Sequence, residues 1–423
     1  MVLDDVLIEK YIGKTGKKLF LLFCWLFTLI VIAAFADMVA GTFNAYETVD
    51  GVTSLSAAAT VNGAAGSISL LFIAFAVVFG LIQKKAQFHG WKQTLLGLVC
   101  TVAAFVIGMN CPLITTKANW SYMVFAYIFL AAVLPMWLLM EPRDLMTTFM
   151  FAGMIIGAVV GLLVAHPAMN LAPYTGFHNE KSGDLFPILF VTVACGAVSG
   201  FHSLVSSGTS SKAITNEKDM PKVGFGAMLL ESLLAVLALC VAGAAASADG
   251  TPAAGTPFAI FSSGVAGFLE MFGIPVYAAQ CFMTMCVSAL ALTSLDYVAR
   301  IGRMSFQELF SVDDMEHAEG WRKLLCNKYF ATVITLVCGY ILTQIGYSNI
   351  WPLFGSANQL LSALVLITLC VFLRVTGREN RTLLVPLVVM LCVTFTALVE
   401  RCIALVKAYN AGTAVFMVEG LQL

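Results

Sequence analysis

The sequence predicts an all-α polytopic membrane protein, and three observations point to that fold class. Hydrophobic residues make up 60% of the 423 residues and charged residues only 11%, which is outside the range of soluble globular domains. The mean hydropathy is +0.91. The apolar residues are grouped in runs of about 17 to 25, the helix length that crosses a bilayer core of roughly 30 Å. We therefore expect a single integral membrane domain over residues 1–423.

Eleven runs of about this length follow one another along the chain, each bounded by charge, proline or glycine. The first follows a basic stretch and is too long for the core of a signal peptide, so we interpret it as a retained span. A further run, 257–272, is short and lies between Pro257 and the "FGIP" break, which fits a re-entrant or surface helix. The eleven expected spans cover residues 19–43, 63–83, 93–109, 121–140, 144–165, 186–206, 224–248, 276–295, 329–345, 352–373 and 382–406.

The basic residues are divided unevenly between the two sets of loops. Nineteen of the 23 lysines and arginines fall on one set of alternate loops, and the other four are Lys117, Lys181, Arg401 and Lys407. Because cytoplasmic loops are rich in basic residues, we expect a cytoplasmic N-terminus. We also expect residues 296–328 to be a cytoplasmic connection, a solvated linker rather than a regulatory contact. A full crossing at 257–272 would move the later basic loops to the other side.

Composition and motifs exclude several classes of function. The formal net charge of −1 gives no reason to expect nucleic acid as a partner. The twelve cysteines show no CxxC pattern, so we expect neither a disulfide framework nor a metal site. The sequence has no HExxH, Walker loop, nucleophile elbow or dinucleotide fingerprint, so we expect no enzyme and no cofactor.

The end of the sixth run is unusually polar for a membrane helix. It reads "ACGAVSGFHSLVSSGTSSK" over residues 194–212. Glycines weaken the helix and free hydroxyls can contact a solute, which fits a broken helix that faces a wet cavity. Gly196 and Gly200 are four apart, so close helix packing is the other interpretation, and His202 favours the first. The residues that we assign to a substrate or proton pathway here are Gly200, His202, Ser203, Ser206, Ser207, Gly208 and Thr209.

Glu231 is the clearest intramembrane charge. It lies in "GFGAMLLESLLAVLAL", about 10 Å into its span by helical rise, with apolar residues on both sides. An apolar setting favours the neutral, protonated form of a carboxylate, so this group suits the binding and release of a proton. A structural ion pair with a neighbouring helix is the alternative.

Two other polar groups lie near the ends of runs. Asn358 and Gln359 in "WPLFGSANQLL" place two amides about 10 Å below the outer surface, where they either bridge to another helix or bind solute. Asp296 and Arg300 in "ALTSLDYVAR" are four apart on one helix face, and we expect them to pair as a structural cytoplasmic latch. The "EPRD" sequence at 141–144 fits a tight cytoplasmic turn with a purely structural role.

These motifs together resemble the carbon starvation protein A family. The resemblance rests on "SGFHSLVSSGT", "GFGAMLLES", "LTSLDYVAR" and "WPLFGSANQLL" in this order, and it covers nearly the whole chain. It implies an inner-membrane transporter of peptides or pyruvate that serves during carbon starvation. It also implies a fold related to the amino acid–polyamine–cation superfamily, with inverted repeats around discontinuous helices. The glycine/proline-rich "GPxxGP" segment of the family is absent, so we expect a chain that lacks the family's N-terminal spans.

The leading hypothesis is therefore a secondary active transporter. A small nutrient would bind near the bilayer midplane against the broken sixth span and the amides of Asn358 and Gln359. Glu231, with His202, would carry a coupling proton. The residues leave peptide or pyruvate, and proton or sodium, undecided. A channel or a nutrient sensor without active transport is the alternative, and nothing in the sequence sets an oligomeric state.

Overall fold

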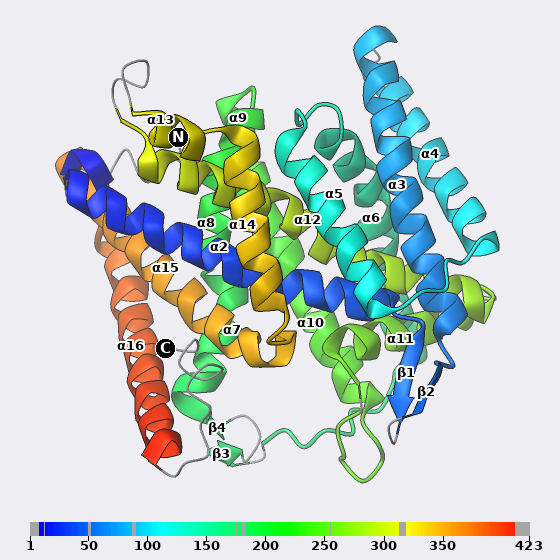
Figure 1. Cartoon of the computed structure of the whole chain (residues 1–423). Coiled ribbons are helices and arrows are strands. Elements are labelled where there is room, and N and C mark those ends of the chain that lie inside the picture. The colour runs from blue at the N-terminus through cyan, green and yellow to red at the C-terminus, as the bar shows by residue number, and fades with distance from the viewer. Residues whose placement is uncertain are drawn as a thin grey trace. The chain divides into compact units, whose positions relative to one another are not determined.

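The structure is a computed structural model that describes residues 8–11, 13–49, 52–86, 90–174, 176–179, 183–253, 255–312 and 319–410. Helices dominate this part of the chain (Figure 1). By length and composition, eight of the described helices are long and apolar enough to cross a membrane, as the composition predicts. They are α2 (Lys14–Phe43), α3 (Ala59–Ala86), α4 (Trp91–Asn110), α6 (Met140–Ala165), α10 (Ala227–Ala245) with the turns before it, α12 (Val276–Phe310), α15 (Tyr347–Val375) and α16 (Arg381–Asn410).

The other expected runs are also helical but shorter. α5 (Lys117–Val133) has 17 residues and α14 (Lys328–Thr343) has 16. α11 (Pro257–Glu270), with 14 residues, is the short helix that the sequence predicts before the "FGIP" break. The side chain of Thr256 caps its first turn, and Gly273 follows it at a positive φ of 82°. Eight long helices establish a multi-pass helical chain, while eleven crossings and the inverted-repeat fold stay predictions.

The chain folds into two compact units. Unit 1 consists of residues 1–34, 174–232 and 297–423, and unit 2 consists of residues 35–173 and 233–296. Three helices, α2, α10 and α12, contribute residues to both units. Each unit is therefore built from segments that are far apart in the sequence.

Unit 2 contains closely packed helices with small residues at their contacts. α3 and α4 lie side by side (Figure 1). A Cβ on Gly108 of α4 would lie 2.5 Å from the side chain of Ile68 on α3, so glycine permits this approach. Ser67 fastens the loop after α4, because its hydroxyl donates to the carbonyl of Cys111 at 2.7 Å and accepts from the N–H of Leu113 at 2.9 Å.

Two short hairpins interrupt the helical pattern. β1 (Tyr46–Val49) and β2 (Val52–Leu55) pair antiparallel in unit 2. β3 (His178–Asn179) and β4 (Gly183–Asp184) pair in unit 1. Both hairpins lie in connections between apolar helices, so the described part of the chain keeps its all-α character.

Unit 1 is held together by aromatic and hydroxyl contacts between its helices. The indole N–H of Trp25 on α2 donates to the hydroxyl of Thr335 on α14 at 3.1 Å. Phe27 stacks on Phe354 of α15 with ring centroids 6.0 Å apart. α15 turns into α16 at Gly377, whose φ of 73° suits glycine. The two helices run beside each other (Figure 1).

α12 is longer than the sequence predicts. The expected span ends at residue 295, but the helix continues to Phe310. Phe306 is buried on this extension and packs on Trp25 with centroids 5.1 Å apart. Part of the expected 296–328 connection is therefore packed helix, and another part forms α13 (Gly320–Leu325), while residues 313–318 lie outside the described residues. The charges of Asp296, Arg300 and Arg303 lower the hydropathy of the extension without ending the helix.

The "EPRD" sequence is also helical rather than a turn. It lies in the first turn of α6, which begins at Met140 instead of residue 144. Pro142 is compatible with this position because the first N–H groups of a helix have no partner within it. Arg143 is 1% exposed, so a residue that the sequence placed in a cytoplasmic turn is buried in unit 2.

Candidate functional site

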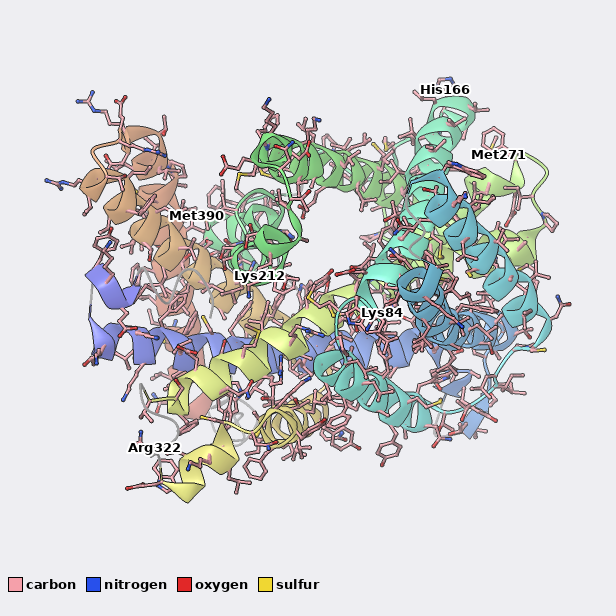
Figure 2. The ribbon with its side chains drawn as sticks, turned by 90° about the horizontal axis from the view of Figure 1, so that it is seen from above. Lys84, His166, Lys212, Met271, Arg322 and Met390 are labelled. Carbon is pink, nitrogen blue, oxygen red and sulfur yellow. The ribbon has the colours of Figure 1, made fainter. Side chains whose placement is uncertain are left out.

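The sixth apolar run is an interrupted helix, as its glycines and serines predict. α7 (Phe190–Ala197) ends before Val198, and α8 (Gly200–Val205) begins two residues later. Ser199, between them, has extended backbone angles of −116° and 125°. A π-helical turn, η2 (Ser206–Ser210), and the short α9 (Ser211–Ala213) complete the segment. Figure 2 shows this part of unit 1 nearly end-on beside Lys212 of α9.

Asn358 of α15 occupies the break. Its carbonyl oxygen, Oδ1, accepts a hydrogen bond from the N–H of Phe201 at 2.8 Å. Its Nδ2 lies 3.2 Å from the sulfur of Cys195 and 3.1 Å from the hydroxyl of Ser199. The first N–H groups of a helix lack partners within the helix, so Asn358 caps α8 from another helix. The side chain is completely buried, which makes the cap part of the protein interior.

Gln359 contacts α7, the helix before the break. Its Nε2 donates to the carbonyl of Val191 on α7 at 3.1 Å, and the hydroxyl of Ser362 donates to its backbone carbonyl at 2.7 Å. Val191 also packs against Val393 and Ala397 of α16. Of the two roles that the sequence left open for Asn358 and Gln359, the structure shows the bridge to another helix.

His202 and Glu231 lie beside the interruption in unit 1. The Nε2 of His202 on α8 is 3.8 Å from Oε1 of Glu231 on α10. Their side chains are 55% and 40% exposed, so the protein does not enclose the carboxylate as the apolar sequence around it suggested. The pair is an ion pair only when the histidine is protonated. Both side chains are therefore partly exposed in unit 1.

The hydroxyls of the segment have local partners. Ser203 donates to the carbonyl of Gly200 at 2.6 Å and Ser207 to that of Leu204 at 3.4 Å. In the π-helical turn, Ser206 is exposed, whereas Gly208 and Thr209 are buried. Such turns are frequent at functional sites because they shift the side chains that follow.

The structure gives Asp296 partners that the sequence did not suggest. Asp296 pairs with Arg143 of α6, and its Oδ2 also accepts from the hydroxyl of Tyr127 on α5 at 2.6 Å. The pairing with Arg300 stays a prediction, while the Asp296 side chain faces two neighbouring helices of unit 2. Asp296 therefore joins three helices.

Arg143 is the buried functional candidate that the sequence reasoning missed. "EPRD" reads as a turn because proline, aspartate and two further charges come together. The signal for a helix was a proline and two charged residues followed by a long apolar run from Leu145, which is how a first helical turn looks. Among the described residues, no group of three or more His, Cys, Asp or Glu is placed to hold a metal ion.

Comparison with known proteins gives consistent matches. The family model described as carbon starvation protein CstA matches residues 5–250 and 244–397. Peptide transporter CstA of Escherichia coli K12 is 30% identical over 352 residues, which are 67% of this chain and 49% of that protein. Peptide transporter CstA of Bacillus subtilis 168 is 29% identical over 367 residues, 74% of this chain and 60% of that protein.

A relative with a different printed substrate matches a shorter stretch. Pyruvate/proton symporter BtsT of Escherichia coli K12 is 39% identical over 163 residues, 36% of this chain and 23% of that protein. This chain therefore spans about half the length of the curated relatives that it matches. The printed names of these three relatives describe transport rather than catalysis.

Proposed function

Because the chain belongs to the carbon starvation protein CstA family, we propose that it is a secondary active transporter that takes up a peptide or pyruvate with a proton. The relatives whose names give an activity are peptide transporters and a pyruvate/proton symporter. The proposal places the protein in the cytoplasmic membrane, with its N-terminus inside, since nineteen basic residues fall on one set of loops. A role in carbon starvation is part of the same proposal.

The observation that carries this proposal is the interruption between α7 and α8. Non-helical backbone at membrane depth is tolerated only where it is buried in protein or lines a wet cavity. Transporters of several folds bind their solute at such discontinuous helices. Here Asn358 keeps the two half-helices apart by capping α8, and Gln359 fixes α7. The proposed solute contacts are the hydroxyl residues and two glycines of this segment, namely Gly200, Ser203, Ser206, Ser207, Gly208 and Thr209.

We assign the coupling proton to Glu231 and His202. The two side chains are 3.8 Å apart and accessible, so a proton on the histidine attracts the carboxylate and its loss releases it. An ionisable residue within an apolar helix is expensive in a bilayer, which supports a functional role. This pair adjoins the interrupted helix, because His202 belongs to α8 itself. Proton binding would then alter the same segment that contacts the solute.

The test is uptake by proteoliposomes under an imposed pH gradient. Labelled pyruvate and labelled dipeptides are offered side by side to the wild type and to Glu231→Gln. We expect the variant to lose uphill accumulation, because the glutamine side chain cannot bind and release a proton. It should retain counterflow exchange. Glu217→Gln is the matched control, since Glu217 is an exposed carboxylate in the turn that precedes α10.

Two results would decide against the proposal. Undiminished uphill accumulation by Glu231→Gln would remove the carboxylate from the coupling step. Solute that equilibrates across the membrane without accumulating, even in the wild type, would instead favour a channel. Binding without any flux would favour a nutrient sensor.

A further inference from the structure

The function proposed above assigns no role to a buried charge cluster in unit 2. Tyr127 of α5, Arg143 of α6 and Asp296 of α12 meet in the interior of this unit. Their exposures are 5%, 1% and 1%. A charge removed from water in this way needs both a partner and a full set of hydrogen bonds. The hydrogen bonds of the cluster are therefore the evidence for its role.

One nitrogen of Arg143 makes both hydrogen bonds within the cluster. Its Nη1 contacts Oδ2 of Asp296 and the hydroxyl of Tyr127. That hydroxyl in turn donates to the same Oδ2 at 2.6 Å. The guanidinium also lies over the Tyr127 ring, 5.1 Å from its centroid. Arg143 and Tyr127 thus converge on a single carboxylate oxygen of Asp296.

Two further atoms of the ion pair are buried without hydrogen-bond partners. Nε of Arg143 and Oδ1 of Asp296 are both in this condition within the described structure. The hydroxyl of Thr293, three residues before Asp296 on α12, is a third such atom. A guanidinium and a carboxylate normally bind through two parallel hydrogen bonds, whereas Asp296 takes only Nη1 and leaves the Nε–H, which points away from Nη1, unused. A pair that only held helices together would gain by closing this second bond.

We infer that Arg143 binds the carboxylate of the transported solute and that Asp296 is the internal carboxylate which the solute displaces. The inference rests on the proposed function, since pyruvate and peptides share one feature, a carboxylate. The Nε–H of Arg143 offers that group a buried donor without a partner, on the side of the guanidinium away from the Nη1 that Asp296 occupies. The Tyr127 hydroxyl, already next to Nη1, can donate to the incoming oxygen.

Charge balance links this exchange to a proton. When the solute carboxylate takes the guanidinium, Asp296 becomes a buried charge without a counterion, and it must accept a proton to remain inside. For pyruvate, one negative charge and one proton then move together, so the step is electroneutral; a zwitterionic dipeptide would move with one net positive charge. The charged and titratable groups that face Asp296 from other helices are Arg143 and Asp144 of α6 and Tyr127 of α5.

The test compares each acid with its amide. The full chain is reconstituted in vesicles of phosphatidylethanolamine and phosphatidylglycerol, and uptake of labelled pyruvate and labelled dialanine is measured. Pyruvamide and dialanine amide are the unlabelled competitors. For the solute that the wild type takes up, we expect the acid to compete about tenfold better than the amide, because the amide cannot form a charge-assisted pair.

Variants of the pair should change this preference in different ways. Arg143→Gln is expected to erase the tenfold preference for the acid. Arg143→Lys should keep part of it, since lysine retains the positive charge but lacks the planar set of N–H donors of the guanidinium. Asp296→Asn should keep the preference for the acid, because Arg143 is unchanged. Arg381→Gln is the matched control, because Arg381 also pairs with a carboxylate but is 86% exposed.

A double variant separates recognition from folding. Arg143→Gln leaves Asp296 buried without a counterion and can unfold the chain for that reason alone. Arg143→Gln combined with Asp296→Asn removes both charges, and we expect it to melt in detergent close to the wild type. The inference requires that this stable double variant still lacks the preference for the acid. A merely structural pair would regain the preference together with the stability.

Three outcomes are distinguishable. Wild-type accumulation with an acid preference that survives in Arg143→Gln and in the double variant overturns this inference and leaves the proposed function intact. Saturable binding of pyruvate or dialanine in detergent that requires Arg143, without accumulation by the wild type, supports the inference and overturns the proposed function. The absence of both accumulation and such binding overturns both.

Discussion

At residue 200 the chain has no room for a side chain. A Cβ there would lie 2.5 Å from the carbonyl oxygen of Asn358 and 2.5 Å from Cβ of Leu361. The close approach of α8 to α15 is what lets the Asn358 amide reach the N–H of Phe201. Glycine at this position is thus a condition for the cap that sustains the interrupted helix.

Replacing Gly200 by alanine should destabilise the protein. The added methyl group meets main-chain and Cβ atoms that cannot rotate away, and overpacking of this kind costs about 1–3 kcal/mol. We expect a lower melting temperature in detergent. Gly196→Ala is the control, because a Cβ on Gly196 meets nothing within 4 Å. Alanine is the better helix former, so this control should melt at the same temperature or above, and equal losses in both variants would contradict the prediction.

Removing the cap should expose one amide. Asn358→Ala leaves the Phe201 N–H without its acceptor, a loss of about 1–3 kcal/mol for a buried donor. We expect faster hydrogen–deuterium exchange at the start of α8, with α16 unchanged. Asn358→Asp should restore protection, since a carboxylate also accepts from this N–H. Unchanged exchange in Asn358→Ala would show that the cap does not hold α8.

Some of these residues could be predicted from the sequence and others could not. The glycines and serines of 194–212 indicated a break, because they weaken a helix wherever they occur. The residues on other helices could not be predicted in the same way. Asn358 is about 160 positions away, and Arg143 stands in a sequence that resembles a turn. Helical spacing paired Asp296 with Arg300, although a side chain on a buried face is free to choose another helix.

At the scale of elements, α12 differs most from expectation. Residues beyond 295 continue the helix for about four turns and reach Phe310. The extension is tied to other parts of unit 1. Glu308 pairs with Lys17 at 3.0 Å, and the side-chain amide of Gln307 donates to the carbonyl of Cys326 at 2.5 Å. A hydropathy scan detects apolar runs, so it predicts the end of a helix where charged residues begin, even if the packed helix continues beyond them.

Hydrogen–deuterium exchange should locate the true end of α12. Amides of residues 297–309 are hydrogen-bonded within a packed helix, so we expect them to exchange about as slowly as those of 282–295. The short α13 and the residues after it should exchange faster. Rapid exchange from residue 297 onward would mean that this stretch is the solvated connection which the hydropathy suggested.

At the scale of the whole molecule, family membership supports a chain that crosses the membrane several times, and the charge distribution predicts its orientation. The family model matches most of the chain, and eight described helices can cross a membrane. The orientation rests on the basic residues alone, because helix length is the same from either side. It predicts that the loop around Lys218 is cytoplasmic and that the start of α5 is external.

Cysteine labelling tests this orientation. In a background without the twelve native cysteines, Lys218→Cys and Ala118→Cys each place one thiol at an exposed position. A membrane-impermeant maleimide should label Ala118→Cys in intact cells and Lys218→Cys only after permeabilisation. The reverse pattern would invert the topology, and labelling of both in intact cells would contradict a crossing between them.

The contact at Gly200 also limits which second mutations can rescue a first one. Shortening Leu361 to alanine would leave its Cβ in place, and the other obstructing atom, the carbonyl oxygen of Asn358, belongs to the main chain. No single side-chain truncation on α15 removes both obstacles. A genetic selection for suppressors of Gly200→Ala should therefore return glycine at residue 200, or changes elsewhere that displace α15, and never a lone change at Leu361.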